Sequence, residues 1–183
     1  MLIDDLDIVP EWLTDGYRGI MLIKRNKDGG EGNAHRKAIK AISRDSESWK
    51  SIIENFRNLQ LTSHIGFRIY ASVNSRRMEK AIHEFKRRQL ESDYGNDKEL
   101  DWFYIDVQNR FFSCLMNERA KESQNFLIDC DSEMEYEDAI AQIPENLILF
   151  DYATKNGRHL ITKPFNTSEI RVQIKKDDML SIA

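Results

Sequence analysis

Two aspartates separated by one residue, Asp129 and Asp131, follow the apolar stretch 126–128. This stretch is typical of a buried strand, and residues two apart on a strand point to the same face. Both carboxylates would therefore point to one place, where their like charges repel. A hard divalent cation such as Mg²⁺ or Mn²⁺ removes the repulsion, because it prefers oxygen ligands. The pair predicts a metal site with Asp129 and Asp131 as ligands.

The same residues also fit the start of a helix. If the strand has already ended, Asp131 or Ser132 is a suitable N-cap for a helix over 133–143, with Glu135 nearby to complete a capping box. On this alternative the acidic residues serve the helix, and the sequence by itself leaves both possibilities open.

A polar and basic stretch over 154–166 contains His159. Asn156-Gly157 predicts a positive-φ turn, with a strand over 158–162 after it. Three basic residues flank the histidine: Lys155, Arg158 and Lys163. A histidine near the start of a strand, with such neighbours, is suited to contact phosphate. The alternative is a solvated basic hairpin with a half-buried histidine.

A third acidic feature, Asp177 with Asp178 after it, follows Lys175 and Lys176. Asp177 is the first choice for a carboxylate at a strand end, and the choice between it and Asp178 stays open. A third carboxylate near the first two would complete a site for one or two metal ions. The alternative is an ordinary turn between two strands.

Taken in order, these motifs resemble the catalytic core of the archaeo-eukaryotic primase superfamily, the primase-polymerases. That family has an Asp-x-Asp strand, a small-x-His motif and a late aspartate after an apolar residue. The corresponding stretches are Phe126-Leu127-Ile128-Asp129-Cys130-Asp131, Asn156-Gly157-Arg158-His159 and Ile174-Lys175-Lys176-Asp177. The close resemblance is confined to the C-terminal third, and the rest of the chain matches in element order alone.

The resemblance implies a metal-dependent nucleotidyltransferase that adds nucleotides, from an NTP or dNTP, on a nucleic-acid template. It implies that Asp129, Asp131 and Asp177 hold the catalytic Mg²⁺ or Mn²⁺, and that His159 contacts the triphosphate of the incoming nucleotide. Such cations activate a 3′-hydroxyl and stabilise the pyrophosphate leaving group.

Basic residues complete the expected site. By proximity, Arg158, Lys155 and Lys163 would be auxiliary phosphate contacts, and Arg68 and Arg76 are candidates for template or nucleotide contacts. The basic face of a helix after Arg76 could follow a nucleic-acid backbone, or it could be an ordinary solvated face. In keeping with the resemblance, a module of this size is expected to act together with a replication protein and to originate from a virus or mobile element.

Apolar periodicity predicts the elements that must position these residues. Strands are expected over 17–24, 67–73, 126–131, 147–152 and 158–162, with a final pair over 170–174 and 179–182. Helices are expected over 49–59, 78–85, 100–114 and 133–143. The first of these helices has Asp45, Ser46 or Ser48 as its N-cap.

This order, a βαβαα unit followed by βαββ and a terminal pair, predicts an α/β (α+β) fold with a mixed sheet covered by helices. One domain over 1–183 is expected, with an N-terminal helical and strand module over 1–120 and a catalytic module over 121–183. The resemblance makes the second module RRM-like.

Composition narrows the class of protein. The chain has 27 Lys and Arg against 31 Asp and Glu, a net charge of -4, which is not typical of a protein that coats DNA but is compatible with a local basic groove. Cys114 and Cys130 lie in apolar patterns, so both are expected to be reduced core residues. With no basic secretory start and no apolar run long enough for a bilayer, a cytoplasmic protein with no membrane contact is expected.

Two other functions compete with nucleotidyl transfer. Asp151, with Gln173-Ile174-Lys175 further on, loosely fits a metal-dependent nuclease. A degenerate primase-like protein that binds or inhibits a replication partner without catalysis is the non-enzymatic alternative. A simple RNA-recognition module is disfavoured, because the 126–130 strand lacks the aromatic pair that such a sheet uses.

Overall fold

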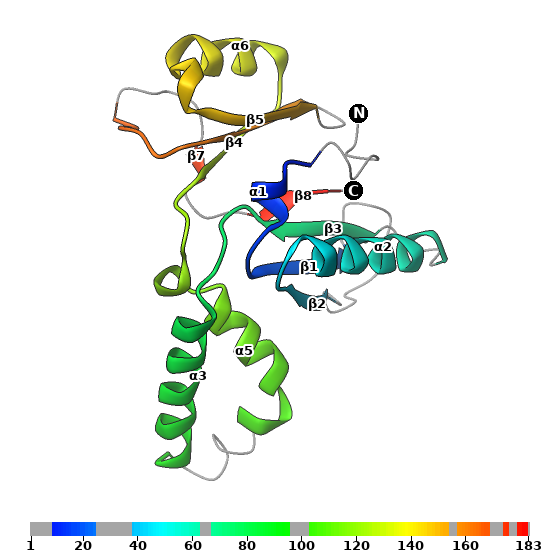
Figure 1. Ribbon diagram of the computed structural model, residues 1–183, viewed down its shortest axis with the longest axis vertical. Helices are drawn as coiled ribbons and strands as arrows, with labels where there is room; N and C mark the ends of the chain where they lie inside the picture. The colour runs from blue at the N-terminus through cyan, green and yellow to red at the C-terminus, as the bar shows by residue number, and fades with distance from the viewer. Residues whose placement is uncertain are drawn as a thin grey trace.

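A computed structural model of the chain describes residues 9–24, 38–62, 67–95, 103–153, 157–168, 174–175 and 179–182. Within them the strands form two four-stranded sheets, and every strand pair is antiparallel. The α/β (α+β) class expected from the sequence is confirmed, although two sheets take the place of one mixed sheet. Figure 1 shows these two sheets and a pair of helices that extends away from them.

The first sheet has the strand order β2-β1-β3-β8. Its strands are β1 (Arg18–Lys24), β2 (Ala38–Ser43), β3 (Phe67–Ser72) and β8 (Met179–Ser181). The short helix α1 (Glu11–Thr14) precedes β1, and α2 (Ser46–Thr62) joins β2 to β3. Trp49 of α2 packs with Ile20 and Ile69 of the sheet in one buried cluster. Strand β2 has no counterpart among the elements expected from the sequence.

The N-cap of α2 is Asp45, as one of the three expected alternatives had it. Its Oδ1 accepts a hydrogen bond from the backbone N–H of Ser48 at 2.8 Å, and the Ser48 hydroxyl accepts one from the Asp45 N–H at 3.0 Å. These reciprocal bonds satisfy N–H groups that the first turn leaves without partners. The bonds from Ser48, then that from Arg44, lower the pKa of Asp45 to about 2.

Helices α3 (Met78–Asp93) and α5 (Val107–Leu115) form the projecting pair of Figure 1. The basic face expected on α3 is partly neutralised, because Arg87 and Arg88 both bind Glu84. Helix α5 is shorter than the stretch 100–114 predicted for it. The 3-10 helix η3 (Glu118–Ala120) follows it. None of the described helices has both the length and the apolar composition that a bilayer crossing requires.

The second sheet has the strand order β5-β6-β4-β7. Its strands are β4 (Phe126–Cys130), β5 (Ile148–Ala153), β6 (Arg158–Thr162) and β7 (Ile174–Lys175). Helix α6 (Glu133–Gln142) and the 3-10 helix η4 (Glu145–Leu147) lie between β4 and β5. Alternation along the strands gives this sheet two apolar faces. Ile128 and Leu160 pack with Ala139 of α6, whereas Leu127 and Ile161 belong to the cluster of the first sheet.

Among the described residues the two terminal strands, β7 and β8, do not pair with each other, which corrects the expectation of a final hairpin. Strand β7 pairs with β4 in the second sheet, and β8 pairs with β3 in the first. The C-terminal module expected over 121–183 therefore supplies an edge strand to the sheet built by the N-terminal module. The two modules are thus connected by strand pairing as well as by side-chain packing.

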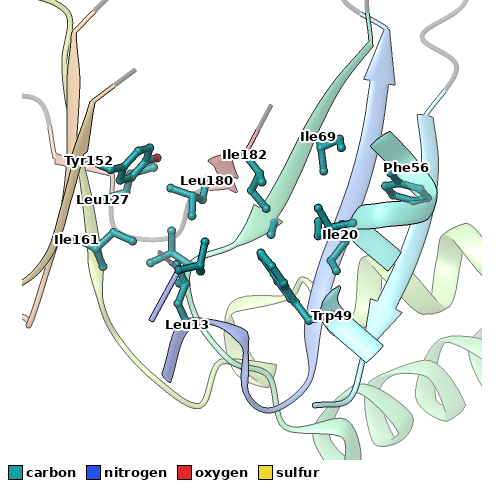
Figure 2. Close-up of a cluster of buried hydrophobic side chains, with 14 of the residues drawn as sticks. Leu13, Ile20, Trp49, Phe56, Ile69, Leu127, Tyr152, Ile161, Leu180 and Ile182 are labelled. Atoms are coloured by element: carbon teal, nitrogen blue, oxygen red, sulfur yellow. The ribbon is translucent and has the colours of Figure 1, made fainter. Parts of the chain in front are cut away.

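A common hydrophobic core lies between the two sheets (Figure 2). Leu180 and Ile182, from β8 and the residue after it, lie between Ile20 of the first sheet and Leu127 and Ile161 of the second. All five side chains are at most 2% exposed. Burial of this kind contributes about 25 cal/mol per Å² of apolar area, so the core joins the two sheets energetically.

Arg18 fastens the segment around α1 to the end of β3. It is 2% exposed, and its guanidinium donates hydrogen bonds to the carbonyl oxygens of Trp12 at 2.6 Å, Val73 at 2.7 Å and Asp15 at 3.0 Å. Burial disfavours the charge and lowers the pKa of Arg18 to about 10.

Candidate functional site

Asp129 and His159 lie directly opposite each other on β4 and β6. The imidazole Nε2 is 2.8 Å from Oδ1 of the carboxylate, and the two side chains are 12% and 26% exposed. Both motifs that the sequence singled out thus meet at one point, because the antiparallel register pairs these two residues. The face that carries them is the one whose apolar members, Leu127 and Ile161, pack toward the first sheet.

Tyr152 extends this contact and was missed by sequence reasoning. It lies opposite His159 on the neighbouring strand β5, and its hydroxyl is hydrogen-bonded to Nδ1 of His159. The two rings meet edge to face with centroids 5.2 Å apart. Burial, and then the charge of Asp129, raise the pKa of the Tyr152 hydroxyl. The sequence did contain a signal for this contact. In a hairpin of β5 and β6, residues at equal distances from the turn lie opposite each other.

Asp131 is separated from this arrangement by the end of the strand. Strand β4 ends at Cys130, so the alternation that was to align the two carboxylates stops one residue before Asp131. Ser132 is the N-cap of α6 and accepts a hydrogen bond from the N–H of Glu135 at 3.3 Å. The Glu135 carboxylate in turn accepts one from the N–H of Asp131 at 2.8 Å. The helix-start alternative is therefore confirmed for Ser132.

The described residues do not assemble a metal site. Among them there is no group of three or more His, Cys, Asp or Glu side chains placed to hold a cation. The carboxylate of Asp129 contacts the imidazole of His159, and Asp177 lies outside the described residues. Strand β7 pairs Ile174 with Ile128 and then Lys175 with Leu127, so it runs away from the Asp129 end of β4. Among the described residues, no third metal-binding side chain therefore groups with Asp129 and Asp131.

Arg158 lies on the opposite face of the second sheet from His159. Its guanidinium binds the carboxylate of Asp151 at 2.7 and 3.1 Å and stacks over the ring of Tyr136 at 4.4 Å. Tyr136 also donates its hydroxyl to Asp151 at 2.6 Å. The bond to Asp151 raises the pKa of Arg158. This cluster fixes α6 to β5 and β6, and it does not present Arg158 to a phosphate held by His159.

Two other basic candidates, Arg76 and Arg68, lie outside the second sheet. Arg76 is 1% exposed, and its guanidinium faces the carbonyl oxygens of Met116 and Asn117 at 3.4 Å. The expected contact of Arg76 with template or nucleotide is therefore corrected to a structural role beneath the surface. Arg68 lies on β3 of the first sheet.

Two lysines remain among the basic candidates. Lys163 is exposed beyond the end of β6, where its backbone N–H donates to Leu147. Lys155 lies outside the described residues.

Gly157 has a different role from the one predicted. Among the described residues the glycine with positive φ is Gly16, so Gly157 does not supply a left-handed turn. A Cβ at position 157 would instead lie 1.9 Å from the carbonyl oxygen of Cys130. Glycine is required because β6 begins in close contact with the backbone at the end of β4. The small residue of the Gly-x-His pattern thus lets the histidine strand approach the Asp129 strand.

Comparison with protein-family models, curated proteins and solved structures finds no match for this chain. The resemblance to primase-polymerases therefore depends on the motif residues themselves and on how they are arranged. Of these residues, Asp129, Gly157 and His159 come together at one end of β4 and β6.

Proposed function

We propose that this protein is a nucleotidyltransferase of the primase-polymerase type, which uses NTP or dNTP on a nucleic-acid template. The observation that supports the proposal is the 2.8 Å contact between Asp129 and His159, since these residues belong to separate motifs of the same proposed site. A cytoplasmic location belongs to the proposal, because nucleoside triphosphates and a template are available there.

In this proposal His159 is the phosphate contact. Its Nε2 faces a carboxylate oxygen of Asp129, and a phosphate oxygen is an acceptor of the same kind. An incoming triphosphate could therefore take over a hydrogen bond that the protein already makes. Asp129, Asp131 and Asp177 would be the ligands of Mg²⁺ or Mn²⁺, which supplies positive charge at the phosphates when bound. Among the described residues no three such side chains are grouped, so the proposed cation site depends on Asp177, which lies outside them.

Nucleotide titration tests the proposal. Labelled ATP and dATP are titrated into the full chain with Mn²⁺, and binding is compared between the wild type and Asp129→Asn. We expect the substitution to weaken binding by about tenfold or more, since it removes a charged ligand of the cation that would neutralise the phosphates in this proposal. Asp138→Asn, on the exposed part of α6, is the matched control and should bind as the wild type does. Absence of nucleotide binding by the wild type, or equal binding by the wild type and Asp129→Asn, would overturn the proposal.

A non-catalytic primase-like binding protein is the second candidate. It is favoured by one observation: Asp129 and Arg158, two of the residues expected to act on substrate, are each engaged by another side chain of the protein. A primer–template extension assay with Mn²⁺ separates the two functions. Extension that Asp129→Asn abolishes supports the enzyme, and template binding without incorporation supports the binding protein.

The nuclease alternative has less support. Asp151, its proposed acid, binds Arg158 and Tyr136 on the α6 face of the sheet, and Gln173 lies outside the described residues. The extension assay also covers this case, because shortened primer would reveal cleavage.

A further inference from the structure

A chain of polar side chains crosses three adjacent strands of the second sheet. Tyr152 on β5, His159 on β6 and Asp129 on β4 are consecutive partners in the strand register. The Tyr152 hydroxyl is bonded to Nδ1 of His159, and Nε2 of the same ring contacts Asp129. Both nitrogens of the histidine are therefore held by the protein, each by a different partner.

Tyr152 is anchored in the core rather than at the surface. It is 8% exposed and belongs to the cluster that joins the two sheets, and Figure 2 shows its ring beside Leu127. The ring of Phe150 stacks on it at 5.4 Å. A ring fixed in this way holds its hydroxyl in one place, so the hydrogen bond also orients the imidazole.

The direction of the hydrogen bonds follows from the chemistry of the two end groups. Nε2 faces a carboxylate oxygen that can only accept, so Nδ1 of a neutral ring is the nitrogen that accepts from the Tyr152 hydroxyl. A neutral imidazole that accepts at Nδ1 carries its own proton on Nε2. That N–H then points at the carboxylate of Asp129, which can only accept.

We propose that Tyr152 is a positioning residue that fixes the tautomer of His159, so that Nε2 carries the proton and faces the site as a hydrogen-bond donor. Its consequence for nucleotide binding rests on the proposed function, because a donor at Nε2 suits a phosphate oxygen and a lone pair there would repel it. Tyr152 is thus a residue of the core that acts on the motif residue His159.

Imidazole ¹⁵N spectroscopy of the full, metal-free chain tests the proposal. Long-range ¹H–¹⁵N spectra near neutral pH separate the two tautomers and the doubly protonated ring, and His159→Gln assigns the signal. In the wild type we expect His159 as the Nε2–H tautomer. In Tyr152→Phe, which removes the hydroxyl alone, we expect the Nδ1–H tautomer to appear beside the Nε2–H tautomer that Asp129 still favours. Tyr136→Phe removes a tyrosine hydroxyl from the opposite face of the sheet and should leave the His159 signal unchanged.

The outcomes separate this inference from the proposed function. A wild-type Nδ1–H tautomer or a doubly protonated ring overturns the inference without any variant, as does an unchanged tautomer in a folded Tyr152→Phe protein. In the Mn²⁺ and ATP titration, Tyr152→Phe should weaken nucleotide binding by roughly two- to tenfold, the effect of one hydrogen bond. If the wild type binds no nucleotide while the tautomer shift is observed, the proposed function fails and the positioning role of Tyr152 stands.

Discussion

The carbonyl oxygen of Cys130 leaves no room for a side chain at position 157. An alanine Cβ there would lie 1.9 Å from that oxygen, and the obstacle is backbone within a sheet. At Gly19, by contrast, a Cβ would meet only side chains, the Sδ of Met116 at 2.5 Å and the ring of Phe112 at 2.9 Å. The two glycines therefore allow the same substitution to be compared against a rigid and a movable neighbour.

We expect Gly157→Ala to lower the free energy of unfolding by about 1–3 kcal/mol or more, because β6 must move away from β4. Gly19→Ala should cost less, since the side chains of Met116 and Phe112 can shift more easily than the backbone of a sheet. Urea unfolding of both variants measures the difference. Nucleotide binding by Gly157→Ala should also fall if the Asp129–His159 contact opens with the strands. Equal stability losses would contradict the close-approach explanation.

The thiol of Cys130 lies beneath the same site. It is 1% exposed, and burial, together with the charges of Glu135 and Asp129, raises its pKa from an ordinary 9.0 to about 11. Because the unfolded chain loses this proton first as pH rises, the thiol contributes stability below pH 9 that is lost as pH passes about 11.

A thiol reagent such as Ellman's reagent checks this environment. In Cys114→Ala, which leaves Cys130 as the one thiol of the chain, native protein at neutral pH should react far more slowly than protein in guanidinium chloride. Rapid complete reaction of the native protein would contradict the burial of Cys130.

Among the elements, helix α2 begins with the capping side chain of Asp45. Asp45→Ala removes the acceptor for the Ser48 N–H and should lower the urea midpoint, whereas Asp45→Asn keeps a good N-cap and should lower it less. The lowered pKa of Asp45 makes the advantage of the carboxylate depend on pH. That advantage is present above an ordinary pKa of 3.8 and is lost as pH falls through about 2.

Urea midpoints of the wild type and Asp45→Asn, measured from neutral pH down to about pH 3, check this dependence. The gap between the two proteins should narrow as the pH falls. A gap that stays constant would show that the charge of Asp45 does not stabilise α2.

Local sequence patterns predicted most of the elements, because each depends on residues close together in the chain. Strand β6 has the predicted bounds, and α2, α3 and α6 follow their apolar stripes. The partners of the terminal strands could not be predicted in this way. Whether β8 pairs with β7 or with β3 is decided by Leu180 and Ile182 in the inter-sheet core, which forms from segments far apart in the sequence.

The candidate site shows the same division between local and distant information. Asp129 and His159 were found because their types and strand positions are visible in the sequence. Side chains alternate between the two faces of β6, so Arg158 points away from His159. The prediction that both residues contact phosphate depended on their being adjacent in the sequence. Tyr152 carries no sign of chemistry by itself, and its role depends on the register of a neighbouring strand.

At the scale of the whole molecule, the chain returns to its first sheet after completing most of the second. Strand β8 pairs Leu180 with Ala71 of β3, and Ile182 donates its N–H to Ile69 at 2.8 Å. The core that these residues complete also contains Tyr152 and Ile161 of the site-bearing sheet. Each sheet therefore covers apolar surface of the other, and we expect the two to unfold in one cooperative transition.

Leu180→Ala tests this coupling. Leu180 is fully buried between the sheets, so truncation removes apolar contacts and leaves a cavity, at a cost of about 2–5 kcal/mol in the free energy of unfolding. Leu61→Ala is the matched control, because Leu61 is 84% exposed on α2 and should change stability by less than about 0.5 kcal/mol. The His159 ¹⁵N signal follows the second sheet. The fluorescence of Trp49, measured with Trp12 and Trp102 replaced by Phe in all proteins compared, follows the first. Both probes should give the same lowered urea midpoint in Leu180→Ala, and separate midpoints would mean that the two sheets unfold independently.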